Sequence, residues 1–182
     1  MDRRDFLKTV AITGAALSIQ HSEAMEILTQ TINNTNGGNP DLVAVMGGEP
    51  EAMFRRAISE LGGMKQFVKP GQKVVVKPNI GWDKVPELAG NTNPKLVAEI
   101  VKQCFAAGAK EVTVFDHTCD DWQKCYKNSG IEAAAKAAGA KVMPAHLESY
   151  YKPVNLPNGQ KMKKAKIHEA ILNCDVWINV PI

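Results

Sequence analysis

Side chains suited to chemistry follow the apolar runs that look like the strands of a sheet. Lys77 and Asn79 come just after a run of three valines, and Asp116 and His117 come just after the next such run. In open α/β sheets, ligands bind beyond the carboxyl ends of the strands because the loops converge there. A lysine that leaves an apolar strand is expected to stay near an anion or a carboxylate. Asp116 and His117 are residue types that transfer protons or bind metals, and we predict them as catalytic residues.

A helix start adds a feature that favours an anion. Thr92 and Asn93 precede a predicted helix, and the free N–H groups and the dipole of a helix start attract negative charge. Together with Lys77 and Asn79 they predict a binding site for a carboxylate or a phosphate. A structural interpretation stays open, in which Lys77 pairs with Asp116 and Asn79 only caps a turn.

The cysteines allow several kinds of chemistry. Cys119 and Cys125 lie in a polar segment close to His117, and three interpretations compete for them: a disulfide, a metal or iron–sulfur site, or free thiols. The C-x-x-C spacing of common metal sites is absent. Cys104 falls on the apolar stripe of a predicted helix and is expected in the core, and Cys174 precedes the last predicted strand. The sequence alone assigns no cofactor.

Several functional classes lack their sequence signatures here. The chain has no G-x-G-x-x-G after its first predicted strand, no G-x-x-x-x-G-K-[ST] motif and no G-x-S-x-G motif. The net charge is only +3. A nucleic-acid surface would need a larger basic area with aromatic partners. The solvated face of a strand accounts for the alternating lysines, which are Lys161, Lys163, Lys164 and Lys166.

The elements that position these residues form an α/β pattern. Apolar runs of strand length alternate with helical stripes, which predicts a mostly parallel, Rossmann-like sheet with helices on both faces. A β-hairpin is expected near 150–167, around Pro157-Asn158-Gly159. The predicted strands span 42–46, 73–77, 111–116, 141–143 and 175–180, and the predicted helices begin at Pro50, Pro94 and Gly130, with a brief helical turn near 167–172.

The first 24 residues are predicted to be an export signal, followed by a flexible linker over 25–40 and one domain over 41–182. An apolar run over 10–19 is too short to span a bilayer, and Ser22-Glu23-Ala24 offers a cleavage site. The alternative is a basic N-terminal helix of the domain, but the run has no polar face at helical spacing. The start resembles a twin-arginine signal, with matches at Arg3, Arg4, Phe6, Leu7 and Lys8.

That resemblance implies a location and a partner. Twin-arginine signals direct folded proteins, often with an inserted cofactor, through the twin-arginine translocase. We therefore expect an exported, periplasmic or extracytoplasmic protein with no stable membrane span after cleavage. The same resemblance favours a redox or metal role.

Three further blocks of sequence resemble the family called domain of unknown function 362. They are Val-Val-Val-Lys-Pro-Asn at 74–79, Asn-Thr-Asn-Pro at 91–94 and Gly-Ala-Lys-Glu-Val-Thr-Val-Phe-Asp at 108–116. The closing Cys-Asp-Val-Trp-Ile-Asn-Val-Pro at 174–181 is similar to a later strand of the family. The resemblance implies site positions at Lys77, Asn79, Thr92 and Asp116, and no established reaction.

The family pattern also differs from this chain in two ways. Family members usually continue past the Val-Pro with Lys-His-rich and Lys-Asn motifs, so the resemblance predicts an incomplete domain here. Some members carry ferredoxin-like cysteine clusters, and this chain has none, so an iron–sulfur role does not carry over.

Two hypotheses about function follow. In the first, the protein is an exported enzyme, redox- or metal-associated, with an anion-binding cleft at the strand ends. Lys77 and the helix start at Thr92 and Asn93 would hold the anion, and Asp116 and His117 would transfer protons or bind a metal. In the second, the same cleft belongs to a non-catalytic binding protein for a small anionic ligand. Neither hypothesis involves nucleic acid.

Overall fold

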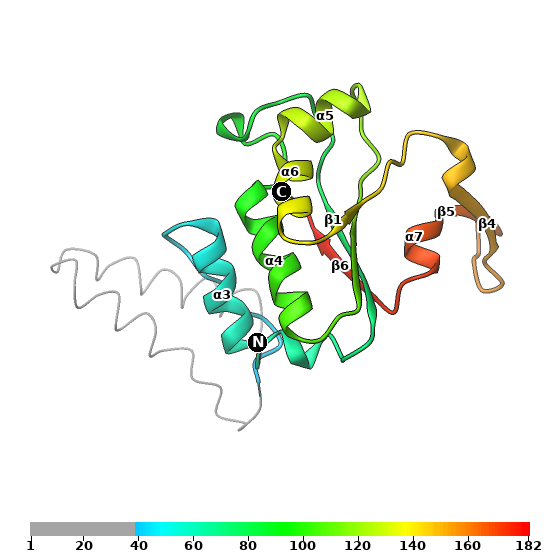
Figure 1. Ribbon diagram of the computed structural model, residues 1–182. Helices are drawn as coiled ribbons and strands as arrows, with labels where there is room; N and C mark the ends of the chain where they lie inside the picture. The colour runs from blue at the N-terminus through cyan, green and yellow to red at the C-terminus, as the bar shows by residue number, and fades with distance from the viewer. Residues whose placement is uncertain (1–38) are drawn as a thin grey trace, which may run out of the picture. The chain divides into compact units, whose positions relative to one another are not determined.

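The computed structural model describes residues 39–182. The predicted signal over 1–24, and the predicted linker up to residue 38, lie outside the described residues. The described domain is built on one parallel sheet with helices packed on it and a separate β-hairpin (Figure 1).

Four parallel strands form the sheet, in the order β3-β2-β1-β6. Their pairing is parallel throughout, which confirms the predicted mostly parallel α/β architecture. Val74 to Val76 at the centre of β1 are buried because strands lie on both sides of them. The strands are β1 (Lys73–Pro78), β2 (Glu111–Val114), β3 (Lys141–Val142) and β6 (Val176–Val180).

Most of the core lies on one face of the sheet, under the longest helices. Successive strand residues point to opposite faces, so Val74 and Val76 share this face. They cluster there with Val97 and Val101 of α4, which follow the predicted helical stripe. The helices on this side are α3 (Pro50–Glu60), α4 (Pro94–Ala106) and α6 (Ile131–Ala137), and α5 (Trp122–Asn128) contacts α6.

The opposite face of the sheet carries a smaller cluster. Val75, Phe115 and Ala145 pack there against Ala170 of α7 (Glu169–Leu172). Helices therefore lie on both faces, as predicted. Beside α7 lies the predicted hairpin, made of the antiparallel strands β4 (Tyr151–Asn155) and β5 (Lys164–His168). Short 3-10 helices occur at Met64–Gln66, Pro86–Leu88 and Glu148–Tyr150.

One predicted strand is wrong and one helix escaped prediction. Leu42 to Met46 forms no strand, and Leu42 and Met46 are 83% and 89% exposed. An apolar run becomes a strand only where a neighbour offers its open edge, and this run pairs with no strand of the described sheet. Helix α5 occupies part of the polar segment around Cys119 and Cys125, where no helix was predicted. Between residues 39 and 182, every helix is too short or too polar to cross a bilayer.

Candidate functional site

The order of the strands creates a switch point between β1 and β6. From β1 the chain moves to β2 and β3 on one side, and β6 then adds to the other side of β1. Helix α4 makes the connection on one face, whereas α7 lies on the other. The connections that lead to β2 and to β6 therefore lie on opposite faces of the sheet, and open sheets of this kind bind ligands beyond the carboxyl ends of the strands at such a switch point.

A hollow of about 260 Å³ lies at this switch point. Lys77 of β1 is paired in the ladder with Asn179 of β6, so the two side chains leave neighbouring strands at the same level. Asp116 reaches the hollow from the end of β2. We call it the strand-end hollow, and its lining comprises Lys77, Pro78, Asn79, Asp116, Asn179, Pro181 and Ile182.

An ion pair joins the two charged side chains of this hollow. Lys77 Nζ lies 2.5 Å from Asp116 Oδ1, and the exposed fractions of the side chains are 32% and 7%. The second carboxylate oxygen accepts a hydrogen bond of 2.8 Å from the Ile80 amide. Each oxygen of the carboxylate therefore has a partner, whereas the ammonium has three N–H groups and gives only one to Asp116. The remaining two have no protein acceptor among residues 39–182.

A tyrosine missed by the sequence analysis holds the backbone of Asp116. The Tyr126 hydroxyl accepts a hydrogen bond of 2.8 Å from the Asp116 amide. The same hydroxyl lies 2.8 Å from the carbonyl oxygen of Asp116 and 3.0 Å from that of Met143. Burial raises the pKa of Tyr126, so the hydroxyl keeps its proton and acts as donor and acceptor together. The signal for this residue was the spacing of Trp122, Cys125 and Tyr126 on one face of α5.

The Asn-Thr-Asn block acts as a clamp around the strand ends. Asn91 is buried and its side chain bonds both the amide and the carbonyl of Trp82. The Thr92 hydroxyl accepts from the Asn79 amide and donates to the Val180 carbonyl, at 2.9 and 2.8 Å. Asn93 caps α4 by accepting from the Lys95 amide. Neither Thr92 nor Asn93 lines the strand-end hollow, so their role as ligand-binding residues stays a prediction.

Asn79 is held in a tight turn at the edge of the hollow. Its side-chain oxygen accepts a hydrogen bond of 2.9 Å from the Gly81 amide. A Cβ atom at Gly81 would lie 3.0 Å from that oxygen, a tight contact that favours glycine at this position. The contacts of the structural interpretation, an ion pair for Lys77 and a turn for Asn79, are thus both present. These two contacts still leave two N–H groups of Lys77 without an acceptor among residues 39–182, at the strand-end hollow.

His117 lies beside Asp116 in sequence but does not line the strand-end hollow. Its Nδ1 lies 2.9 Å from the Ala145 carbonyl oxygen and 3.2 Å from the Tyr151 hydroxyl. A carbonyl can only accept, so Nδ1 carries a proton, and Nε2 is the ring nitrogen left to act as an acceptor. Burial, and then the charge of Asp116, raises the pKa of Tyr151. The hairpin brings the Tyr151 hydroxyl close to His117 at the end of β2. The local sequence could not predict this contact between distant segments.

The cysteines do not come together with His117 as a metal site. Cys104, Cys119, Cys125 and Cys174 are all free thiols in the structure. Cys125 is buried and its pKa is raised by burial, whereas Cys119 is exposed. Within the described part of the chain, no three His, Cys, Asp or Glu side chains are arranged to hold a metal ion.

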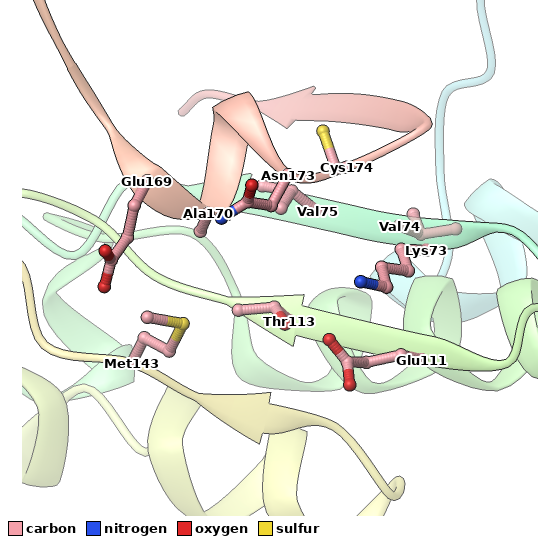
Figure 2. A pocket seen from close by; sticks show the side chains of 10 residues that line it. All are labelled: Lys73, Val74, Val75, Glu111, Thr113, Met143, Glu169, Ala170, Asn173 and Cys174. Atoms are coloured by element: carbon pink, nitrogen blue, oxygen red, sulfur yellow. The ribbon is translucent and has the colours of Figure 1, made fainter. Parts of the chain in front are cut away.

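A second hollow, of about 210 Å³, lies on the sheet face near α7. Figure 2 shows Thr113 and Val75 from the strands, with Glu169 and Lys73 toward opposite ends. We call it the face hollow. It sits along the strands instead of at their carboxyl ends, and its charged side chains are divided between its two ends, with Glu169 at one and Lys73 and Glu111 at the other. It was not predicted from the sequence.

Comparisons with known proteins bear on the same region. The family model described as Domain of unknown function (DUF362) matches residues 74–182, which include every residue of the strand-end hollow. The chain is also similar to the thylakoid-associated protein sll1697 of Synechocystis sp., with 39% identity over 130 residues. This match covers 71% of the chain and 39% of the relative. No solved structure matches the chain.

Proposed function

The chain belongs to the DUF362 family, and we propose that it binds a small carboxylate or phosphate in the strand-end hollow. The observation that carries this proposal is the ammonium of Lys77, which leaves an apolar strand at the switch point of the sheet. Asp116 uses one of its N–H groups, and the other two are free to bind oxygen atoms of a ligand. Asn179 supplies an amide group at the same rim, which Asn79 also lines with its side chain bonded to the Gly81 amide and the Gly90 carbonyl.

The charges in the hollow favour a small ligand over a highly charged one. Lys77 and Asp116 together are neutral, so an incoming anion gains a hydrogen-bonded cation but also meets a nearby carboxylate. Because Asp116 is already bonded to Lys77 and the Ile80 amide, its charge is partly compensated before the ligand arrives. A monoanion such as a carboxylate suits this balance best, and phosphate is the second case.

Calorimetric titration with acetate and with inorganic phosphate tests the proposal. Removing Lys77 alone would strand a buried carboxylate and destabilise the fold. The informative variant is therefore the neutral pair Lys77→Met with Asp116→Asn, and Lys102→Met serves as the matched control at an exposed lysine. We expect binding of one of the two probes in the wild type and the control, and none in the neutral pair. Equal binding in all three proteins would contradict the proposal.

An enzymatic version of this function is favoured by one observation at His117. The Ala145 carbonyl fixes the tautomer, so Nε2 is available as a base at the end of β2. In this version Asp116 and His117 would transfer protons on the bound anion. Replacing His117 by Gln would then abolish turnover and leave the calorimetric affinity for the anion unchanged. Loss of affinity in that variant would argue against a purely catalytic role.

We further propose that the protein is exported by the twin-arginine route and works outside the cytoplasm. The support is the pair Arg3-Arg4 with the following Phe6, Leu7 and Lys8. A relative named as thylakoid-associated is in keeping with work near a membrane. Mass spectrometry of the mature protein tests the route: cleavage after Ala24 is expected, and an intact Met1 on exported protein would contradict it.

The redox or metal association stays a separate proposal, supported only by the resemblance to a twin-arginine signal. Metal analysis and ultraviolet–visible spectra of protein folded in its native host test it. A bound metal or a visible chromophore is expected, and a colourless, metal-free protein would contradict it.

A further inference from the structure

The hairpin of β4 and β5 carries a one-sided excess of positive charge. Between Ser149 and His168 the sequence has five lysines and no aspartate or glutamate. Two of these lysines are paired with acids just outside the segment: Lys152 with Glu169 at 3.8 Å, and Lys166 with Glu148. The remaining lysines, Lys161, Lys163 and Lys164, are exposed and have no ion pair within residues 39–182.

The tip of the hairpin is a closed loop that presents these lysines. The Leu156 amide donates to the Lys163 carbonyl at 2.8 Å, and the Gly159 amide donates back to the Leu156 carbonyl at 3.0 Å. A Cβ atom at Gly159 would lie 2.0 Å from the Met162 carbonyl oxygen, so only glycine permits this turn. The backbone of the tip is therefore fixed. Its lysines are held in one small region without neutralising acids.

An apolar side chain stands in the middle of this charge. Met162 lies between Lys161 and Lys163 in the chain and is 60% exposed. Figure 1 shows the hairpin at the margin of the domain, on the side of α7 and away from α3 and α4. The domain therefore does not cover the tip, and a flat surface could approach it without meeting those helices.

We propose that this tip, residues 156–164, docks on the surface of an anionic phospholipid bilayer. Lysines close to an anionic membrane gain from its negative surface potential. Their alkyl stems and an exposed methionine can enter the headgroup region while the ammonium groups stay in water. Three unpaired lysines around one exposed methionine match that chemistry. The strand-end hollow plays no part in this inference, which holds whether or not the hollow binds an anion.

The composition of the tip favours a bilayer over a nucleic acid. Single-stranded nucleic acids bind to grooves with stacking aromatic side chains and arginines, and the tip has neither between Asn155 and Lys166. The aromatic residues at the base, Tyr150 and Tyr151, are partly buried. An exposed methionine adds nothing to phosphate binding, but it adds apolar area to a membrane contact. A contribution of Met162 to binding would therefore distinguish a bilayer from a nucleic acid as the partner.

Vesicle co-sedimentation of the full chain tests the proposal. The probes are vesicles of phosphatidylcholine alone and vesicles in which part of it is replaced by phosphatidylglycerol. Each lysine near an anionic surface is worth about a fivefold change in partitioning, so Lys161→Gln, Lys163→Gln and Lys164→Gln together should lower binding roughly a hundredfold. The matched control, Lys102→Gln with Lys110→Gln and Lys127→Gln, changes the net charge equally at exposed positions outside the hairpin. Both triple variants keep residues 1–38, so any contribution of that segment cancels.

Three results would overturn the proposal. The first is equal binding of the wild type to neutral and anionic vesicles. The second is an equal loss of binding in the two triple variants, which would indicate a general effect of net charge. The third concerns Met162→Ser, which should weaken vesicle binding about fivefold and leave retention on a heparin column unchanged. If this variant binds vesicles as well as the wild type, the tip is a general polyanion surface instead.

Discussion

The two faces of the sheet differ in how they are packed, although the same strands form both. On the α4 face, Val74 and Val76 enter a large cluster of buried apolar residues. On the α7 face, Val75 belongs to a cluster of only four buried residues, and the imidazole of His168 stacks on Phe115 with 4.0 Å between ring centres. Adjacent residues of one strand thus face a dry core on one side and a mixed, partly polar layer on the other.

This difference separates the source of stability from the place of chemistry. Close packing on the α4 face supplies most of the buried apolar area. The α7 face instead carries imidazole side chains, with His168 on it and His117 at its edge. The strand-end hollow, with the ion pair of Lys77 and Asp116, lies at the carboxyl ends of the strands that separate the two faces.

Truncation of adjacent valines should give the largest contrast between the faces. Val76→Ala removes two methyl groups from the close-packed core and should cost about 2–3 kcal/mol in the free energy of unfolding. Val75→Ala removes the same groups beside the face hollow, where water can enter, and should cost about 1 kcal/mol. Urea unfolding of both variants measures this. Equal costs would show that the α7 face is packed as tightly as the other.

The next effect concerns Thr92, which links the ends of β1 and β6. Thr92→Val keeps the shape but leaves the Asn79 amide and the Val180 carbonyl without their shared partner. We expect a loss of about 2 kcal/mol in unfolding free energy, and near wild-type stability for Thr92→Ser, which keeps the hydroxyl. A stable Thr92→Val protein would contradict this clamp.

On the α4 face, we expect the free energy of unfolding to depend on pH in the alkaline range. Burial raises the pKa of the Cys104 thiol to about 12, above its ordinary value. The unfolded thiol ionises first as pH rises, so its contribution to stability falls above about pH 8.5, by about 2 kcal/mol between pH 8 and pH 10. In denaturation curves measured at pH 8 and pH 10, Cys104→Ala should lack this part of the difference in unfolding free energy. The exposed-site control Cys119→Ala should keep it.

On the α7 face, the effect of pH should appear on the acid side and be the smallest. Burial lowers the pKa of His168, whose Nδ1 accepts from the Ala170 amide and whose Nε2 faces the Pro144 carbonyl. The contribution is complete above the unfolded pKa of about 6.5 and is lost as pH falls through the lower folded pKa. His168→Asn keeps an acceptor for α7 and should unfold with less dependence on acid pH. The exposed His146→Asn should retain the wild-type dependence.

The α4 face was predictable from the sequence because its information is local. Three valines in a row, a helical stripe after Pro94 and an asparagine cap each specify an element by themselves. The adjacency of Lys77 and Asp116 also followed, because β1 and β2 are neighbours joined by one helix. Helix α5 was within reach as well, since Asp121 caps it and Trp122, Cys125 and Tyr126 share one face.

The rest depended on pairings between distant segments. Leu42 to Met46 has the composition of a buried strand, but nothing in its own residues says whether an open edge will receive it. Asn179 reaches Lys77 only because β6 adds beside β1 instead of beside β3. Tyr151 reaches His117 because the hairpin folds back toward β2. Local sequence patterns do not show which distant segments will pair.

The most direct test of the strand-end hollow follows the nitrogen of Lys77 itself. In protein with ¹⁵N-labelled lysine, the Nζ resonance of Lys77 is assigned by its absence in Lys77→Arg, and acetate or inorganic phosphate is then added. We predict a saturable shift of this resonance with the ion pair to Asp116 kept, while the resonance of Lys102 stays in place. A Lys77 signal that does not move, at anion concentrations that shift other lysines, would contradict the account.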